Sequence, residues 1–529
     1  MPSRVASMRS GEVNGVGAMG ATVSVARLIE AVAAEHPDKT AVVDGEREHS
    51  YGTLNQTVTQ LATRFCAQQL MGERVALMLP NGLGMLCCYL ACFRMGAVAT
   101  PLNYRYAPPE LERALVAAEP KVLVIHQARL DLLARVAPTA VADCQVVVVS
   151  GGQDPLAPGL ANFASTLGED TAPTMPDAPS SDSPAAMFFT SGSTGRPKGV
   201  VHTQASARAI LESTDAALGG IRDSDIIQVA EPLVHVSGFI ASLSVLMRCG
   251  TVVLLDTYDE ARYVATLRRW HPTLICTHND VFAKLSRWPD IRREDFGALR
   301  GVYAGGERVS EELQERFGGL TGLSIQVGWG MTEAIWLTIC REPRCGTDEC
   351  IGRPIDGVAL RVTDPDGHEL SIGEVGEFRV RGPMVMQGYW RDPEETAKAM
   401  EGGWLRTGDS GWRDAGGDYW FSARIKDLIV RNTSKITPGE VEAALNAHDS
   451  VAASGVVGVP DREEGQVPVA FVVLVPGHEI DEPELLDFLR SRIAQYKIPA
   501  RVNFVDSLPL TRSGKLDHLA LRTLAERDA

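Results

Sequence analysis

The sequence has little positive charge and no hydrophobic run long enough to cross a membrane. Its 51 Lys and Arg residues are outnumbered by 67 Asp and Glu residues, which gives a formal net charge of −16. This balance argues against nucleic acid or an anionic membrane as the main partner. An apolar run at residues 83–101 is interrupted by Arg94 and Gly96, so it predicts a buried helix that leads to a strand.

The ten cysteines lack the CxxC spacing that is typical of zinc sites. Those in the apolar run at residues 83–101 are predicted to be packed, and all ten are typical of the reduced thiols of a cytoplasmic protein. Three others form a C-x4-C-x4-C run, for which we expect loop thiols without a metal. These three are Cys340, Cys345 and Cys350.

The length of 529 residues allows roughly three or four domain-sized units. Residues 1–21 have no apolar core of signal-peptide length, and we expect a disordered leader. Short β-branched runs then alternate with helical segments, which predicts parallel α/β layers. Residues 151–184 are rich in Pro, Gly, Ser and Asp and predict a surface connection. The predicted strands lie at residues 75–79, 97–101, 121–125, 144–149, 226–229, 251–255 and 274–277.

From about residue 351 the pattern changes to strands and turns, which predicts an antiparallel β subdomain at residues 351–425. A smaller α+β unit is expected at residues 426–529. In it, residues 467–475 predict a strand, residues 483–495 predict an amphipathic helix, and the capping pattern of residues 437–440 opens another helix. We therefore expect an α/β protein with a large N-terminal domain, residues 22–425, and a small C-terminal domain.

The most informative stretch is the Gly/Ser-rich run at residues 190–199, Thr-Ser-Gly-Ser-Thr-Gly-Arg-Pro-Lys-Gly. It follows an apolar run that predicts a buried strand. Its glycines let the backbone approach an anion, its hydroxyls and amides can donate to phosphate oxygens, and Lys198 adds a positive charge. An ordinary P-loop is disfavoured, because no Gly-Lys-Ser/Thr closes the segment and a helix is not expected to start through Pro197. By composition alone, the run would be a flexible loop.

This run resembles the phosphate loop of the acyl-adenylate-forming (ANL) enzymes, which include acyl- and aryl-CoA synthetases, luciferases and the adenylation domains of peptide synthetases. Residues 329–333, 404–409 and 508–515 resemble further motifs of this family, in the same order, and the resemblance extends over nearly all of residues 22–515. It implies an ATP site. The residues that it assigns to ATP or AMP are Thr190, Ser191, Gly192, Ser193, Thr194, Gly195, Lys198, Gly306, Glu307, Trp329, Gly330, Met331, Thr332, Asp409, Arg424 and Lys515.

The resemblance also implies individual roles. Trp329 stacks on adenine, Thr332 contacts the α-phosphate, and Glu333 holds Mg²⁺. An aromatic face suits a base, and a carboxylate suits a hard cation. Asp409, the only carboxylate of its run, accepts hydrogen bonds from the ribose hydroxyls. Taken alone, Thr332, Glu333 and Asp409 would be ordinary turn residues.

Two half-reactions follow from the resemblance, with ATP, Mg²⁺ and coenzyme A as cofactors. A carboxylate first attacks the α-phosphate of MgATP to give acyl-AMP and pyrophosphate, and a thiol then displaces AMP. Lys515 is the family's catalytic lysine of the first step, on a mobile C-terminal domain that rotates about a hinge at Lys426. Taken alone, both would be solvated lysines.

His235 matches the motif of acyl- and aryl-CoA synthetases in which a histidine borders the acyl carboxylate; the alternative is a satisfied core histidine. The small residues of the expected acyl pocket suggest room for a bulky or ring-containing acid rather than acetate. By family position, this pocket is lined by His235, Phe239, Ala304, Gly305, Gly328 and Met331.

The expected thiol loop departs from the family pattern. CoA ligases carry two glycines there, whereas this chain has Asn432, Thr433 and Ser434, whose Cβ atoms hinder a positive φ and a close approach. Ala423 also replaces the glycine that usually precedes Arg424. These changes leave open whether the acceptor is CoA and whether both half-reactions run.

We expect a free-standing acyl-CoA synthetase for a small-molecule organic acid. The alternatives are an enzyme that loads a separate carrier protein or runs one half-reaction, and a homologue that binds an acyl-adenylate without turnover. The oligomeric state stays open, with a homodimer as one arrangement.

Overall fold

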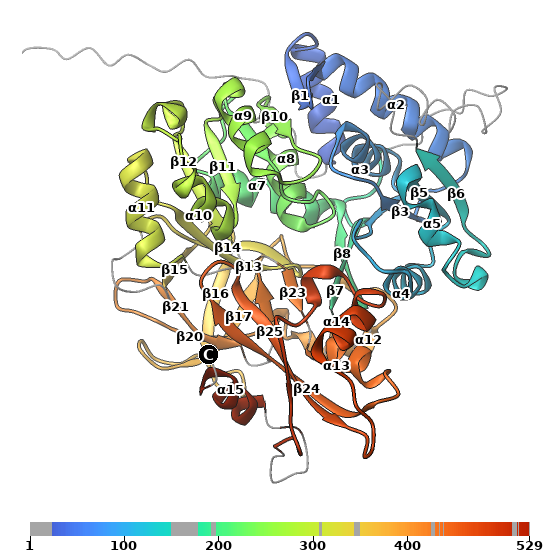
Figure 1. Cartoon of the computed structure of the whole chain (residues 1–529). Coiled ribbons are helices and arrows are strands. Elements are labelled where there is room, and N and C mark those ends of the chain that lie inside the picture. The colour runs from blue at the N-terminus through green and yellow to red at the C-terminus, as the bar shows by residue number, and fades with distance from the viewer. Residues whose placement is uncertain are drawn as a thin grey trace, which may run out of the picture.

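The computed structural model describes residues 24–149, 178–191, 197–305, 309–342, 350–424, 429–432, 434–436, 438–509, 516 and 518–527. In this part of the chain the strands form three sheets, two in a large N-terminal unit and one in a small C-terminal unit (Figure 1). The predicted α/β class with a small α+β unit is therefore confirmed. The predicted leader and most of the predicted surface connection lie outside the described residues.

The longest sheet joins a parallel half to an antiparallel half. The parallel half consists of β1 (Thr40–Asp44), β10 (Thr251–Leu254), β9 (Ile226–Val229), β11 (Leu274–Thr277), β12 (Gly301–Gly305) and β13 (Gln326–Met331), with β2 (Arg47–Ser50) antiparallel at its edge. The antiparallel half consists of β14 (Ala334–Cys340), β15 (Cys350–Pro354), β21 (Tyr419–Arg424), β20 (Trp404–Arg413), β17 (Gly376–Arg381) and β16 (Ala359–Thr363). The predicted β subdomain is antiparallel as expected, but it is not a separate sheet, because β14 and β15 join it to the parallel half.

The second sheet carries the Gly/Ser-rich run. Its strands are β18 (Gly388–Tyr389), β8 (Pro197–Thr203), β7 (Pro184–Ser191), β4 (Val98–Pro101), β3 (Arg74–Met78), β5 (Val122–His126) and β6 (Gln145–Val149). β7 and β8 are antiparallel, with Thr190 opposite Lys198. A strand, not a helix, therefore begins at Pro197, which confirms that the run differs from an ordinary P-loop.

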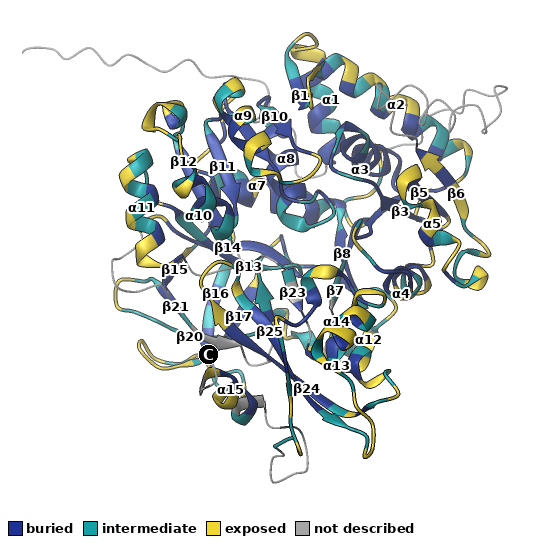
Figure 2. Cartoon of the chain, viewed as in Figure 1, coloured by how far each residue is buried: buried dark blue, intermediate teal, exposed yellow. Residues whose placement is uncertain are grey.

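One hydrophobic core connects both sheets of the large unit with five helices (Figure 2). These helices are α1 (Val25–Glu35), α2 (Tyr51–Ala67), α3 (Leu83–Met95), α7 (Gln204–Ala217) and α8 (Val236–Met247). Helix α3 is buried on all sides, because it is apolar around its whole circumference. Its Cys88 is packed as predicted, and burial raises the pKa of that thiol to about 12. Among the described residues, no helix is both long and apolar enough to span a bilayer.

The remaining helices of the large unit lie mostly toward its surface (Figure 2). They are α4 (Pro108–Ala118), α5 (Leu130–Leu133), α9 (Glu260–Trp270), α10 (Asn279–Arg287), α11 (Glu311–Thr321) and α12 (Pro393–Ala399).

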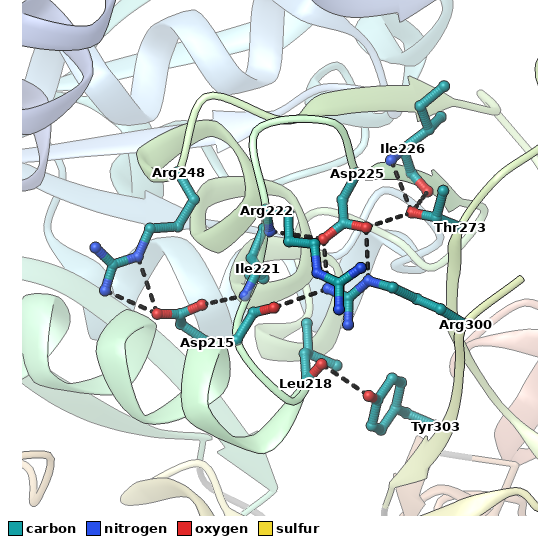
Figure 3. Close-up of polar contacts among 11 residues, drawn as sticks. Asp215, Leu218, Ile221, Arg222, Asp225, Ile226, Arg248, Thr273, Arg300 and Tyr303 are labelled. Carbon is teal, nitrogen blue, oxygen red and sulfur yellow. Dashed lines mark hydrogen bonds and ion pairs between the residues drawn. The ribbon is translucent and has the colours of Figure 1, made fainter. Parts of the chain in front are cut away.

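A buried ion-pair network fixes the start of β9 (Figure 3). The Asp225 carboxylate accepts hydrogen bonds of 2.7 Å from Arg300 Nε, Thr273 Oγ1 and the Arg222 amide. Burial alone would raise the pKa of Asp225, but the Arg300 guanidinium and these donors hold it below its ordinary value. The network ties the amino end of β9 to the residues that precede β11 and β12.

The small unit packs helices against both faces of a mixed sheet, with α13 and α14 on one face and α15 on the other. Its strands are β22 (Ile429–Arg431), β23 (Ser434–Ile436), β24 (Val451–Asp461), β25 (Gly465–Leu474) and β26 (Arg501–Phe504), and its helices are α13 (Pro438–Asn446), α14 (Glu482–Arg490) and α15 (His518–Arg527). The strand predicted at residues 467–475 is confirmed. The helix predicted at residues 483–495 ends at Arg490, five residues early, because the turn before Gln495 redirects the chain into a short 3₁₀ helix, Gln495–Lys497.

Candidate functional site

Two adjoining cavities lie where the carboxyl ends of β9 and β11 face the small unit. The inner cavity, of about 220 Å³, is lined by residues of both units, among them Thr190, Glu231, His235, Thr277, His278, Gly305, Gly328, Gly330, Met331, Thr332, Trp336, Ser434 and Lys497. The outer cavity, of about 700 Å³, shares Glu231, His235, His278 and Ser434 with it and adds Arg105, Tyr258 and Asn432. The carboxyl ends of parallel strands are the usual place for a binding site in such sheets.

The inner cavity gathers residues that the sequence assigned to different sites. His235, Gly305, Gly328 and Met331 from the expected acyl pocket meet Thr190 and Thr332 from the nucleotide set and Ser434 from the thiol loop. Residues that the family resemblance assigns to the acyl, nucleotide and thiol sites therefore line one space.

Two residues predicted for the acyl pocket do not line this cavity. Phe239 is 1% exposed and packs its ring against Tyr89 and Phe188, with centroids 5.0 and 5.3 Å away. Ala304 is equally buried and belongs to the core around α10 and α11. Both side chains serve packing behind the wall of the cavity.

Trp336 fills part of the space that the small residues open. Its indole lies within ordinary contact of the Cα positions of Gly305 and Gly328, since a Cβ added there would meet it at 3.6 and 3.4 Å. The glycines thus make room for a tryptophan as well as for a ligand. Sequence reasoning missed Trp336, although it follows the motif at residues 329–333 by three positions.

Trp329 and Asp409 are brought together from motifs 80 residues apart. The indole Nε1 of Trp329 donates a hydrogen bond to Asp409 Oδ2 at 3.1 Å, and its ring packs edge-on against Phe378. Both residues are buried. This contact links the two motifs that the family resemblance assigns to adenine and ribose.

The segment that carries Thr332 and Glu333 is held by two side chains. His202 Nε2 lies 2.8 Å from the Thr332 carbonyl oxygen, and Tyr389 Oη donates to Glu333 Oε1 at 2.8 Å. Burial lowers the pKa of His202 to about 4, so its ring is neutral at pH 7. Burial and then Glu333 raise the pKa of Tyr389, which keeps the phenol a donor.

Glu333 has the properties of a magnesium ligand. It is 7% exposed, and no ion pair within the described residues involves its carboxylate. A buried carboxylate held only by a neutral phenol can offer a hard oxygen to a cation that keeps its other positions for phosphate and water. The residues present therefore fit Mg²⁺.

Lys198 is engaged by an acidic partner rather than free. Its ammonium pairs with Glu395 and lies 5.0 Å from the centre of the Tyr389 ring. Hydrogen bonds from Lys198 and Lys398 lower the pKa of Glu395 to about 2. A phosphate that binds Lys198 must share this lysine with Glu395 or displace it.

His235 lies at the N-cap of α8 and is half-buried, with its Nε2 atom shielded from solvent. Its Nε2 has no hydrogen-bond partner among the described residues. Burial, and then the nearby Arg105 and His278, lower the pKa of His235 to about 4. The ring is neutral at pH 7 and presents an unused polar atom, which differs from a satisfied core histidine.

The segment that the resemblance assigns to the thiol loop has a positive φ at Asn432, although the Cβ atoms of residues 432–434 are expected to hinder this conformation. Asn432 has φ = +43°, in the left-handed region, and its amide donates to the Glu464 carbonyl oxygen at 2.8 Å. Asparagine is among the non-glycine residues that tolerate this region best. The chain therefore meets the conformational demand without glycine, and Asn432 and Ser434 both face the cavities.

A charged contact between the units was not foreseen. Lys497 Nζ lies 2.8 Å from Glu110 Oε1 in the large unit and 3.0 Å from Glu440 Oε2 in its own unit. Lys497 is 5% exposed. Burial alone would lower the pKa of Lys497, but Tyr496 and the two carboxylates raise it. The residue lies in a Tyr-Lys-Ile-Pro run, yet the sequence gives no sign of its partner.

Several predicted residues lie outside the described part of the chain, or their side chains do, and their assignments stay predictions. These are Ser191, Gly192, Ser193, Thr194, Gly195, Gly306, Glu307, Arg424, Lys426, Thr433 and Lys515, together with Cys345. The prediction of loop thiols is wrong for Cys340 and Cys350, which are buried in β14 and β15 with their sulfur atoms 3.7 Å apart.

Comparisons with known proteins match most of the chain. A family model described as "AMP-binding enzyme" matches residues 29–390, and one described as "AMP-binding enzyme C-terminal domain" matches residues 440–515. The chain is 34% identical over 489 residues to a feruloyl-CoA synthase of an Amycolatopsis species, covering 91% of this chain and 94% of that protein. It is 31% identical over 519 residues to an indoleacetate–CoA ligase of Aromatoleum aromaticum, covering 96% and 99%.

Solved structures give the same result. The amide bond synthetase McbA of Marinactinospora thermotolerans has a TM-score of 0.84 at 29% identity, covering 95% of this chain and 99% of that one. A double mutant of the o-succinylbenzoate CoA synthetase MenE of Bacillus subtilis, bound to a product analogue, has a TM-score of 0.81 at 25% identity, covering 96% and 99%.

Proposed function

Because this chain belongs to the AMP-binding enzyme family and is an AMP-forming carboxylic acid–CoA ligase, we propose that it activates a ring-containing organic acid in the inner cavity and transfers it to CoA there. The observation that carries this proposal is the convergence of His235, Thr332 and Ser434 on one space. These residues come from the acyl, nucleotide and thiol segments. Both half-reactions can therefore use one bound acyl group.

In the first half-reaction, the acid's carboxylate oxygen attacks the α-phosphorus of ATP, and pyrophosphate leaves. The adenosine end is proposed to lie at Trp329 and Asp409, whose side chains are already joined. Thr332, held through its carbonyl by His202, is proposed to contact the α-phosphate. Glu333 would hold Mg²⁺, which neutralises phosphate charge when bound. Catalysis rests on positioning and on charge stabilisation, the role proposed for Lys515.

In the second half-reaction, the thiol sulfur attacks the acyl carbonyl carbon and AMP leaves. The outer cavity is the proposed path of the thiol arm, because Asn432 and Ser434 line it and it shares His235 and Ser434 with the inner cavity. The left-handed backbone at Asn432 supports this path, since glycine is the residue that usually adopts this conformation. A neutral His235 leaves the acyl carbonyl region without a competing positive charge.

The ring-containing class rests on the cavity wall and on two relatives. Trp336, Ile335 and Ile240 give the inner cavity an aromatic and apolar side. The relatives named above are a feruloyl-CoA synthase and an indoleacetate–CoA ligase, and both names denote ring-containing acids. A flat ring against Trp336 gains stacking as well as burial.

The test is formation of AMP, acyl-AMP and acyl-CoA from MgATP with a panel of aliphatic, aryl and polycyclic acids, with and without CoA. We expect acyl-CoA from ring-containing acids and little from acetate. Acyl-AMP without thioester, from every acid, would show that the acceptor is not CoA. No product even from synthetic acyl-AMP and CoA would refute the proposed second half-reaction.

A further inference from the structure

Glu231 is a buried carboxylate that has no ion-pair partner in the described part of the chain. It follows β9, is 3% exposed and lines both cavities. Neither carboxylate oxygen has a hydrogen-bond partner of good geometry among the described residues. Its main chain is fixed, because Asn81 Nδ2 donates to the Glu231 carbonyl oxygen at 2.8 Å. The carboxylate is thus held at the cavity wall and can accept further hydrogen bonds from a ligand.

The groups next to Glu231 are polar. Thr277 and His278 also lie on the cavity wall, and His278 Nδ1 has no hydrogen-bond partner among the described residues. His278, and then the Thr277 hydroxyl, which lies near enough to donate to Glu231, oppose the rise that burial causes in the pKa of this carboxyl. No Lys or Arg in the described part of the chain forms an ion pair with Glu231, so the unmet demand is for a hydrogen-bond donor.

A buried polar atom without a partner is unfavourable, and most such atoms in folded proteins are satisfied by protein, water or ligand. A carboxylate, a hydroxyl and an imidazole nitrogen that share one wall are a ready-made receptor for a small polar group. A hydroxyl donates once and accepts twice, which Glu231 together with Thr277 and His278 can match. An ammonium has three protons to donate and cannot accept, so it could not take a hydrogen bond from Thr277 or His278.

We propose that Glu231 selects acids that carry a hydroxyl group, which donates its hydrogen bond to the Glu231 carboxylate inside the cavity. Thr277 and His278 complete the contact to the hydroxyl oxygen. This inference rests on the proposed ligase function and names the substrate class within it. An acid without the hydroxyl leaves Glu231 unpaired, and a dicarboxylic acid brings a second carboxylate toward it.

The experiment measures kcat/KM for acyl-CoA formation with matched sets of benzoic, phenylacetic and cinnamic acids. Each set holds the unsubstituted acid and its hydroxyl, methoxy and amino forms at the ortho, meta or para position. For at least one scaffold we expect the hydroxyl form to exceed the unsubstituted form by at least about tenfold, because a site built to bond a hydroxyl rejects the analogue that lacks it.

Substitutions of Glu231 test whether this residue causes the preference for a hydroxyl group. In Glu231→Leu we expect the hydroxyl-to-unsubstituted ratio to fall to about one or below, and in Glu231→Gln, which keeps an acceptor, to fall only in part. Glu119→Gln is the matched control, because Glu119 is an exposed glutamate that lines neither cavity, and its ratio should equal that of the wild type. The nearly isosteric Glu231→Gln keeps the test decisive where Glu231→Leu folds poorly.

The outcomes separate the two claims. Thioester formed equally well from hydroxyl and unsubstituted acids, or an unchanged ratio in both Glu231 variants, would overturn this inference and leave the ligase function standing. A preference for the amino form would overturn the assignment of a hydroxyl. No acyl-AMP and no thioester from any acid would overturn the proposed function and this inference with it.

Discussion

Lys497 of the small unit and Glu110 of the large unit form a buried ion pair, with Nζ 2.8 Å from Oε1. Glu110 also accepts a hydrogen bond from the Ala107 amide at the start of α4, and Glu440 accepts a second bond from Lys497. The pair therefore fixes the small unit at the point where its thiol loop faces the cavity. If the small unit rotates between half-reactions as the family resemblance implies, this contact must break and form again.

Replacing Lys497 by Met should slow thioester formation by about tenfold or more while it spares formation of acyl-AMP. The loss removes the cation that pairs with the buried Glu110 and the half-buried Glu440, which disfavours this docked arrangement. Pyrophosphate release without CoA and acyl transfer from synthetic acyl-AMP measure the two steps. Glu119→Gln is the control, since it removes only an exposed pair with Arg391. Equal losses in both steps would contradict a role confined to docking.

Asn432 should accept glycine but not a β-branched residue. Asn432→Gly keeps the left-handed backbone and should retain thioester formation, whereas Asn432→Val should reduce it at least about tenfold, because a β-branched residue is strained at positive φ. The acyl-AMP step should not change in either variant. Normal acyl transfer from acyl-AMP to CoA in Asn432→Val would show that this conformation is not needed.

Trp329→Phe should raise the KM for ATP by about five- to tenfold, because it removes one hydrogen bond to the carboxylate that is proposed to bind ribose. The aromatic face stays, so kcat should change little. Steady-state pyrophosphate release against ATP concentration gives both values. Trp412→Phe provides the comparison, since Trp412 stacks on Trp420 and does not line either cavity; a similar rise in that variant would make the effect general.

The folded state should lose stability as the pH falls from about 6.5 toward 4. His202 has a native pKa of about 4, whereas an unfolded histidine titrates near 6.5, so acid protonates the unfolded chain first. This residue alone should lower the free energy of unfolding by about 2 kcal/mol between pH 8 and pH 5. Urea unfolding at the two pH values measures the difference.

His202→Gln should reduce that pH dependence, and His368→Gln should not, because His368 is exposed in a turn. The same slope in wild type and His202→Gln would mean that other groups cause the acid sensitivity.

Much of the fold could be predicted from the sequence, because hydrophobic periodicity reports local structure directly. The strand at residues 226–229 and the helix within residues 83–101 are examples. The continuity of the long sheet could not be foreseen, since it depends on which strands pair rather than on where strands lie. The helix at residues 483–495 was predicted too long for a related reason, as tertiary contacts decide where the chain turns.

For the site, motifs predicted which segments meet but not which partners their side chains take. Lys198 was expected to face phosphate, yet its partner Glu395 lies 197 residues away. Glu231 stands in the sequence as a charged residue between an apolar strand and a proline, which would suit an exposed loop. Only its burial and the absence of a partner within the described structure distinguish it.

The two ends of β9 have different roles. Its first end is locked by Asp225 and Arg300, which serve folding, and its last end leads to Glu231, which is proposed to serve discrimination. Substitutions near Glu231 can therefore change which acids are accepted, while the ion pair between Asp225 and Arg300 keeps β9 in place. A short, strongly anchored strand of this kind lets a lineage explore new substrates without first acquiring a more stable protein.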